Sequence, residues 1–181
     1  MGAWIFDPLH TQVEFSAKHL GMMTVRGHFA EVVAGGDINV EDPTRSQIEV
    51  TVQTASIRTH DAQRDKDLRA SYFLEVEKYP TMTFKSTGVE VTANDRYSLT
   101  GDLTIKGTTR PITLAVVKYG EFTDPNMGHR IGYSAEGAIN RKDFGMTFEM
   151  MLDNKFVVSN EVRIQIEGEL LEEGSMPAPA G

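Results

Sequence analysis

The sequence of 181 residues contains no cysteine. Disulfides, thiolate metal ligands and cysteine nucleophiles are therefore excluded. Basic residues are also scarce, because 18 Lys and Arg stand against 26 Asp and Glu and leave a formal net charge of −8. Surfaces that bind nucleic acid or anionic membranes need clustered cations. The composition argues against both kinds of partner.

Long hydrophobic runs are missing as well. No apolar stretch approaches the roughly 18 residues that a membrane-spanning helix needs, so stable membrane insertion is not expected. The first residues, MGAWIFDPLHTQ, lack the cationic and apolar segments of a secretory signal peptide. We therefore expect a cytoplasmic protein, or an extracytoplasmic one if a leader has been removed.

Apolar and polar residues alternate through most of the chain. This period of two predicts about eight half-buried antiparallel strands. Such strands must pair or close to hide their edges, either as a two-sheet sandwich or as a single up-and-down barrel. The alternating segments are residues 13–19, 25–29, 47–53, 82–85, 97–106, 112–116, 131–139 and 162–168.

Residues 59–75 break this alternation and are rich in helix formers. Thr59 is the predicted N-cap, Asp61 falls in the first turn, and Leu68 and Tyr72 stand one turn apart. The segment predicts a short helix near residues 60–75. Its charged residues indicate a solvated face rather than an acid–base pair.

Several inward-facing positions carry small residues between aromatic ones. Each glycine among them can mark a bulge or a bend, but together they favour a barrel with room inside, and an eight-stranded barrel can hold one small ligand. We predict one all-β domain over residues 1–171 and a disordered tail over 172–181, which is small, polar and Pro-rich. The small inward residues are Ala17, Gly27, Gly101, Ala135, Gly137 and Gly168.

Motifs for chemistry are missing. No pair of the five histidines has the spacing of a preformed metal site, and the chain has neither a nucleophile elbow nor a phosphate-binding loop. We therefore predict no catalytic residue and no metal site. Met146, Phe148 and Met150 share one strand face, which suits either core packing or an adaptable apolar partner.

Five segments, in order, resemble the YceI-like polyisoprenoid-binding family across about residues 3–170. The resemblance implies a lipocalin-like barrel whose tunnel holds a polyisoprenoid, such as a quinone tail or a prenyl pyrophosphate, without turnover or a further cofactor. It also makes a homodimer a candidate. Thr11, where the family usually has Ser, and the Met-rich FEMMLDNKF are departures. The segments are WIFDPLHTQVEFSAKHLG, VRGHF, ASIRTHDAQRDKDLRASYFLEVEKYPTMTF, LTGDLTIKGTTRPITL and INRKDFG.

The inward row of side chains is the expected tunnel wall. We expect the protein to act as a carrier, store or scavenger of this lipid. The alternatives are an enzyme acting on an isoprenoid or quinone, and a structural or interaction protein with a filled barrel. The predicted wall consists of Val13, Phe15, His19, Val25, Phe29, Val50, Phe84, Leu99, Leu103, Tyr133, Phe144, Met146 and Phe148.

Three residues are candidates for contact with the lipid head group: His19, Arg64 and Arg141. For each we favour a structural role. His19 ends an inward row and is expected to be a neutral imidazole bonded to backbone or water. The two arginines are expected to pin the helix and the INRKDFG turn to the barrel.

Overall fold

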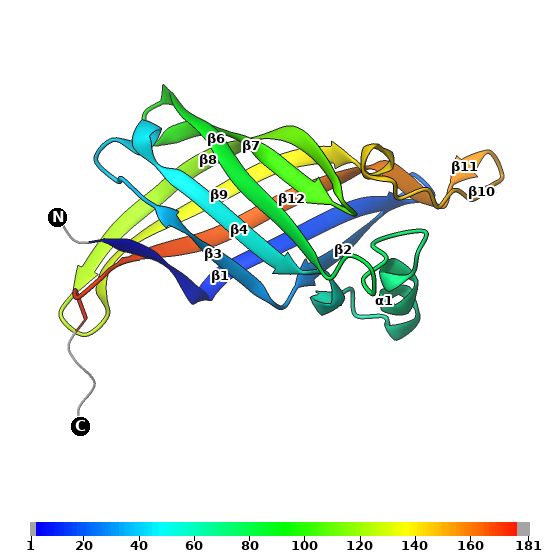
Figure 1. Cartoon of the computed structure of the whole chain (residues 1–181), viewed down its shortest axis with the longest axis horizontal. Helices are drawn as coiled ribbons and strands as arrows, with labels where there is room; N and C mark the ends of the chain where they lie inside the picture. Colours follow the sequence, from blue (N-terminus) through cyan, green and yellow to red (C-terminus); the bar gives the residue numbers. More distant parts are fainter. Residues whose placement is uncertain (1–2, 177–181) are drawn as a thin grey trace.

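The computed structural model describes residues 3–176 and consists mostly of one antiparallel sheet (Figure 1). The strand order in this sheet is β3-β4-β6-β7-β8-β9-β12-β1-β2-β5. Its strands are β1 (Trp4–His19), β2 (Met23–Phe29), β3 (Val32–Asp37), β4 (Gln47–Gln53), β5 (Ile57–Arg58), β6 (Thr81–Ala93), β7 (Arg96–Ile105), β8 (Thr108–Asp124), β9 (Gly128–Asn140) and β12 (Val158–Glu172).

The remaining elements are short. A small hairpin joins β10 (Met151–Leu152) to β11 (Lys155–Phe156), and the single α-helix in the described residues is α1 (Ala62–Arg69). Single-turn 3₁₀ helices occupy Pro43–Arg45, Thr54–Ser56 and Arg141–Phe144. Within residues 3–176, no helix is long and apolar enough to cross a bilayer.

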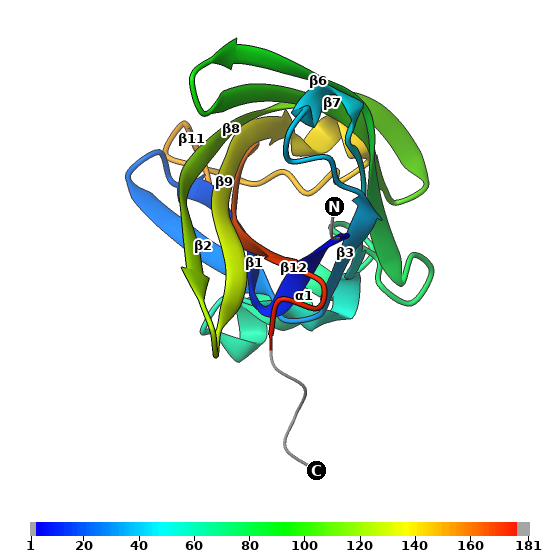
Figure 2. The ribbon, with the colours of Figure 1, turned by 90° about the vertical axis from the view of Figure 1, so that its left-hand side faces the viewer.

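The sheet curls into a barrel of eight strands, as predicted (Figure 2). The count is eight because β2 and β3 are halves of one run bent at Ala30 and Glu31, and β4 and β5 are halves of the next. Pairing continues across the bend, where the Ala30 amide donates to the Ser56 carbonyl and the Gln53 amide to the Glu31 carbonyl. β2 pairs with β1 on its other side. The N-terminal part of β1 lies beside β3 instead. In the part of the chain described, no ladder of backbone hydrogen bonds joins these two strands.

Alternation places the apolar residues inside, as the sequence predicts. Phe84 of β6 pairs with Val50 of β4 and Leu103 of β7, and these three belong to the apolar core or pack against it. On the outer face beside them, Lys85 forms an exposed ion pair with Glu49. The period of two thus separates a continuous apolar interior from a charged exterior.

The inward glycines have a different role from the one expected. A Cβ built on Gly101 would overlap the ring of Phe84, and one on Gly27 would overlap the ring of Phe15. The missing side chains are therefore occupied by neighbouring aromatic rings. Small residues at these two positions allow large residues to pack and do not by themselves leave space.

The helix begins later than predicted. Its N-cap is Asp61, whose Oδ1 accepts a hydrogen bond of 2.7 Å from the Arg64 amide. Thr59, the predicted cap, is buried, and its amide and hydroxyl both donate to Oδ1 of Asp65. The tertiary bond to Asp65 therefore takes the Thr59 hydroxyl away from a capping role. α1 packs at one end of the barrel (Figure 1).

The chain after β12 is placed against β9. The Ser175 hydroxyl accepts from the His129 amide and donates to the Glu172 carbonyl. Residues 172–176 are thus hydrogen-bonded where a disordered tail was predicted to start. Residues 177–181 of the predicted tail lie outside the described residues.

Candidate ligand-binding cavity

A cavity of about 310 Å³ lies inside the barrel. Its wall is predominantly apolar and is contributed by the strands around the whole circumference. Most residues of the predicted tunnel wall face it, and their contact with a ligand stays a prediction. Those that face it are Val13, Phe15, Phe29, Val50, Phe84, Leu99, Leu103, Tyr133 and Met146.

One end of the cavity is closed. The segment after α1 and the turn Arg141–Phe144 fold across it and bury its floor, where Ile57, Phe73 and Leu74 are at most 6% exposed. Lys106 joins the two covering segments, because its Nζ donates to the carbonyls of Ser71 at 2.8 Å and Gly145 at 3.1 Å. A bound molecule therefore passes through this end only if these covering segments move.

The opposite end is the mouth. Its wall residues Phe6, Ile38 and Val40 are only half-buried. They come from the first strand and from the loop of residues 38–46 between β3 and β4, which lie at the end that faces the viewer in Figure 2. The cavity is thus a blind tunnel with one opening.

Neutral polar side chains are spaced along the wall. Thr11, Asn39 and Ser46 line it on the side of the mouth loop and β1, and Tyr97 and Tyr133 line it on the opposite strands. Burial raises the pKa of the Tyr133 phenol to about 12, assisted by electrostatic interactions with Tyr97, Glu121 and Asp95. Tyr133 therefore stays a neutral hydrogen-bonding group at physiological pH.

Four predicted wall residues do not line the cavity. His19 is exposed, because a bulge shifts the β1–β12 register between Ala17 and His19, and its Nδ1 meets the Val157 carbonyl at 3.0 Å. Val25 does not line the cavity, although Ala17, its pairing partner on β1, does. Phe144 is buried in the turn under the floor.

Phe148, the fourth of these residues, belongs to an aromatic cluster behind the floor. Its ring centroid lies 5.1 Å from that of Phe73 and 5.7 Å from that of Tyr72. Phe148 lies in the irregular segment between the turn Arg141–Phe144 and β10 and not in the predicted strand, whereas its neighbour Phe73 lines the cavity. The alternation predicts the inward direction and not how far along the barrel the cavity extends.

The two candidate arginines have different positions. Arg64 lies on α1 outside the cavity and holds the preceding segment, because its Nε and Nη2 donate to the hydroxyl and carbonyl of Thr59, both at 2.9 Å. Arg141 lines the cavity floor and is 2% exposed. Burial lowers the pKa of its guanidinium from the usual value.

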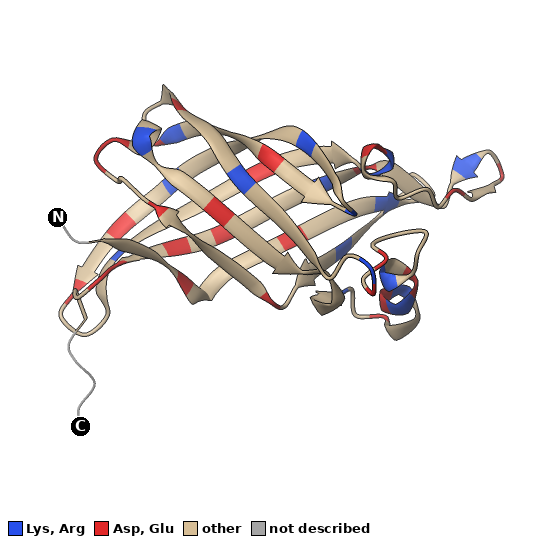
Figure 3. Ribbon diagram, viewed as in Figure 1, with Lys and Arg blue, Asp and Glu red and all other residues tan. Residues whose placement is uncertain are grey.

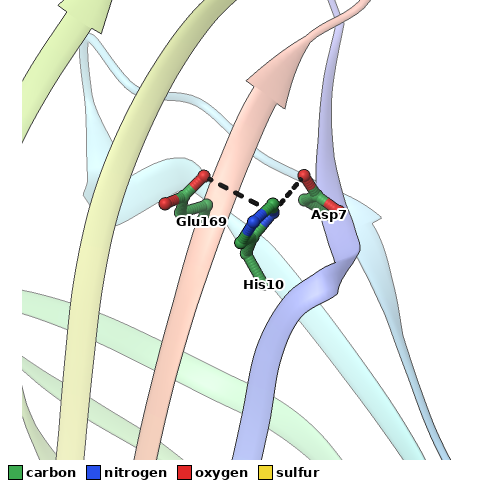
Figure 4. Close-up of side chains that lie close together, drawn as sticks. All are labelled: Asp7, His10 and Glu169. Carbon is green, nitrogen blue, oxygen red and sulfur yellow. Dashed lines mark hydrogen bonds and ion pairs between the residues drawn. The ribbon is translucent and has the colours of Figure 1, made fainter. Parts of the chain in front are cut away.

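Sequence reasoning missed an ionic cluster beside the mouth (Figure 4). Asp7 Oδ2 lies 2.8 Å from His10 Nδ1 and 2.6 Å from Arg130 Nη1, and Arg130 Nη1 also reaches Glu169 at 2.8 Å. Burial alone would raise the pKa of Asp7, but hydrogen bonds from Arg130, His10 and the Leu9 amide hold it at about 2.

This cluster joins three strands through ion pairs. Asp7, His10 and Glu169 could offer three ligand atoms to an ion, but the Arg130 guanidinium already donates a hydrogen bond to each of the two carboxylates. Its residues come from β1, β9 and β12, so the cluster ties the first strand to the sheet. The i, i+3 spacing of Asp7 and His10 was the local signal in the sequence.

Comparison with known proteins gives the family. The family model described as YceI-like domain matches residues 4–170. The UPF0312 protein of Serratia proteamaculans is 38% identical over 159 residues, which are 88% of this chain and 81% of the relative. The crystal structure of the Campylobacter jejuni YCEI protein is 30% identical with a TM-score of 0.75, over 86% of this chain and 90% of that one.

A more distant structure has the same fold. A domain from Saccharophagus degradans, described as polyisoprenoid binding and implicated in plant cell wall breakdown, matches with a TM-score of 0.62 at 14% identity. The match covers 95% of this chain and 99% of that one, and at this identity it bears on the fold alone. The family match and the Serratia relative together place the chain in the YceI-like family.

Proposed function

We propose that the barrel binds a long-chain isoprenoid lipid in its cavity and acts as a carrier, store or scavenger of that lipid. The observation that carries this proposal is the blind apolar tunnel, open at one end. Membership of the YceI-like family supports the ligand class. The Saccharophagus domain, which shares the fold, is itself described as polyisoprenoid binding.

The energetics of burial favour a long chain. Each five-carbon unit contributes roughly 3–4 kcal/mol gross, at ~0.8 kcal/mol per buried carbon. Association itself costs on the order of 4–15 kcal/mol before any net affinity appears. One or two units would barely bind, whereas several could reach micromolar affinity, about −8 kcal/mol. Chain length should therefore dominate affinity.

The cavity wall supports binding rather than turnover. General acid–base catalysis works best with a group whose pKa is near the operating pH. Tyr133, with a pKa of about 12, is poorly matched to that task. The floor residue Arg141 is held by two backbone carbonyls. The proposed role is therefore that of a binding protein.

The test begins with native mass spectrometry of freshly purified protein, followed by extraction and identification of any bound lipid. Isoprenoids of two, four and eight units are then titrated against a fluorescent apolar probe. Affinity should rise steeply with the number of units. Protein that is free of lipid and binds none of the three would contradict the proposal.

A matched pair of variants tests the location. Val116 lines the cavity and the adjacent Ala115 is exposed on the outer face of β8. Val116→Trp should fill the tunnel and weaken binding of the eight-unit lipid at least tenfold, whereas Ala115→Trp should leave it unchanged. Thermal melting checks that both variants fold. Equal affinities in the two folded variants would place the lipid elsewhere.

A further inference from the structure

The cavity floor contains a buried positive charge without an acidic partner. Arg141 is 2% exposed, and Glu149, the carboxylate whose charge acts on it, is paired with Lys142 instead. In the part of the chain described, no carboxylate lies within ion-pair distance of its guanidinium. Buried charges are normally paired, because desolvation is costly. This one is balanced only by neutral groups.

Those neutral groups use part of the guanidinium. Nε donates to the Ser159 carbonyl at 3.0 Å and Nη1 to the Met146 carbonyl at 2.8 Å. The ring of Phe73 lies against it, with Cζ of Arg141 5.8 Å from the ring centroid. A guanidinium has five N–H donors, so most of its donors are left over.

The free donors are directed at the cavity. Among residues 3–176, the only buried side-chain polar atom without a partner is Oδ1 of Asn160, which is an acceptor. Nη2 of Arg141 makes no hydrogen bond within these residues either. Because it is not one of the fully buried unpaired atoms, it keeps some accessible surface. Because Arg141 lines the cavity, its free edge faces the blind end of the tunnel.

We infer that this edge of Arg141 receives a planar oxygen acceptor at the end of the lipid, so that the lipid lies with its head at the floor and its tail toward the mouth. The inference rests on the proposed lipid binding and names its head-group chemistry. Two sources offer such an oxygen, the carboxylate of an isoprenoid acid and the carbonyl of an isoprenoid quinone. A guanidinium edge binds either one.

A pyrophosphate does not fit the floor. It carries more than one negative charge, and the floor offers a single guanidinium among Ile57, Phe73 and Leu74. The surplus charge would be desolvated without compensation. At the mouth, the loop of residues 38–46 carries acidic Glu41 and Asp42 besides Arg45 (Figure 3), and the nearby Arg130 is already paired with Asp7 and Glu169. The geometry therefore favours small heads with one acceptor.

The first test compares four ligands that share one four-unit isoprenoid chain and end in a carboxylate, a benzoquinone, a methyl group or a pyrophosphate. The acid, the quinone or both should bind the wild-type protein at least tenfold more tightly than the methyl-terminated chain. Which of the two does so identifies the source of the oxygen. If neither exceeds the methyl-terminated chain, the head-group inference is wrong while lipid binding stands.

A variant adds a second comparison. Arg141→Met should abolish the preference over the methyl-terminated chain, and Arg141→Lys should retain part of it. Arg163→Met is the control, because Arg163 is exposed on the outer face of β12. Thermal melting reports whether the variants fold, since Arg141 also holds two carbonyls.

Ligand orientation gives a test that needs no variant. The acid is labelled with ¹³C at the carboxyl or at the far methyl end, and a soluble gadolinium chelate is added to the complex with the full chain. The methyl end should relax faster, because it lies nearer the mouth. Faster relaxation of the carboxyl would overturn the inference. If none of the four ligands binds and the eight-unit isoprenoid does not bind either, the lipid-binding proposal is overturned as well.

Discussion

The ring of Phe84 occupies the space that a side chain on Gly101 would need. The two residues lie on neighbouring strands, β6 and β7, and both are buried in the barrel. Gly101→Ala should destabilise the protein by about 1–3 kcal/mol, because overpacking forces the ring or the backbone to move. Urea unfolding of the variant measures this change.

The control for this substitution is Gly88→Ala on β6, where an added Cβ meets no atom within 4 Å. It should change the free energy of unfolding little. The double variant Gly101→Ala with Phe84→Leu should recover part of the loss, because the smaller side chain relieves the overlap. An equal loss at both glycines would refute the packing explanation.

Asp7 should make stability depend on acidity. Its pKa falls from 3.8 to about 2 in the folded protein, which contributes about 2 kcal/mol at neutral pH. Because the folded pKa is the lower one, the contribution is complete above the unfolded pKa and is lost as pH falls through about 2. Asp7→Asn should lose it at pH 7 and flatten the stability profile between pH 4 and 2.

Urea unfolding at several pH values checks this prediction. Asp102→Asn is a suitable control, because Asp102 is exposed on β7. A profile for Asp7→Asn that still parallels the wild type below pH 4 would show that another carboxyl carries the acid sensitivity.

His129 should stabilise the protein in the opposite pH range. Its ring nitrogens meet Glu172 at 2.9 Å and Glu121 at 2.6 Å, and these two carboxylates raise its pKa above 6.5. Stability from the charged ring is complete below the unfolded pKa and is lost as pH rises through the folded one. His129→Gln should therefore cost more stability at pH 5.5 than at pH 8.5.

The single tryptophan reports this titration directly. Trp4 packs edge-on against His129, with ring centroids 4.9 Å apart. A protonated imidazole quenches indole fluorescence, so emission should rise with pH through a midpoint above 6.5. The rise should be missing in His129→Gln. A midpoint at or below 6.5 would contradict the raised pKa.

The N-cap of α1 can be identified by substitution. Asp61→Ala should destabilise the protein by about 1 kcal/mol, because the Arg64 amide loses its acceptor. Asp61→Asn should be close to neutral, since asparagine caps nearly as well. Thermal or urea unfolding distinguishes the two. Equal losses would point to the charge, not the cap, as the source of stability.

The sequence predicts the antiparallel strands because alternation is a local property that every strand carries on its own. The choice of a barrel over a two-sheet sandwich rests on the small inward residues and on the family resemblance. It does not distinguish Thr59 from Asp61 as the cap, because both residue types cap helices and the choice depends on the bond between Thr59 and Asp65. The prediction that His19 faces the barrel interior is wrong for a related reason. The bulge that follows Ala17 shifts the register with β12 and leaves no mark in the alternation.

The candidate site shows the same limit. Apolar wall residues follow from the period of two, whereas the blind end depends on loops that meet only in the folded protein, such as those that Lys106 joins. The cluster of Asp7, Arg130 and Glu169 draws on three strands far apart in sequence. Spacing along the chain therefore reveals only the Asp7–His10 part of it.

The unpaired stretch between β1 and β3 gives the mouth a particular shape. On one flank, residues 4–11 of β1 are fastened to β12 by strand pairing and, through Asp7, to Arg130, which also pairs with Glu169. On the other flank, no ladder joins them to β3. Among the described residues, the rim of the mouth is therefore held by strand pairing on the β12 side and by no ladder on the β3 side. A bulky branched chain can widen the mouth on the β3 side without breaking any strand pairing.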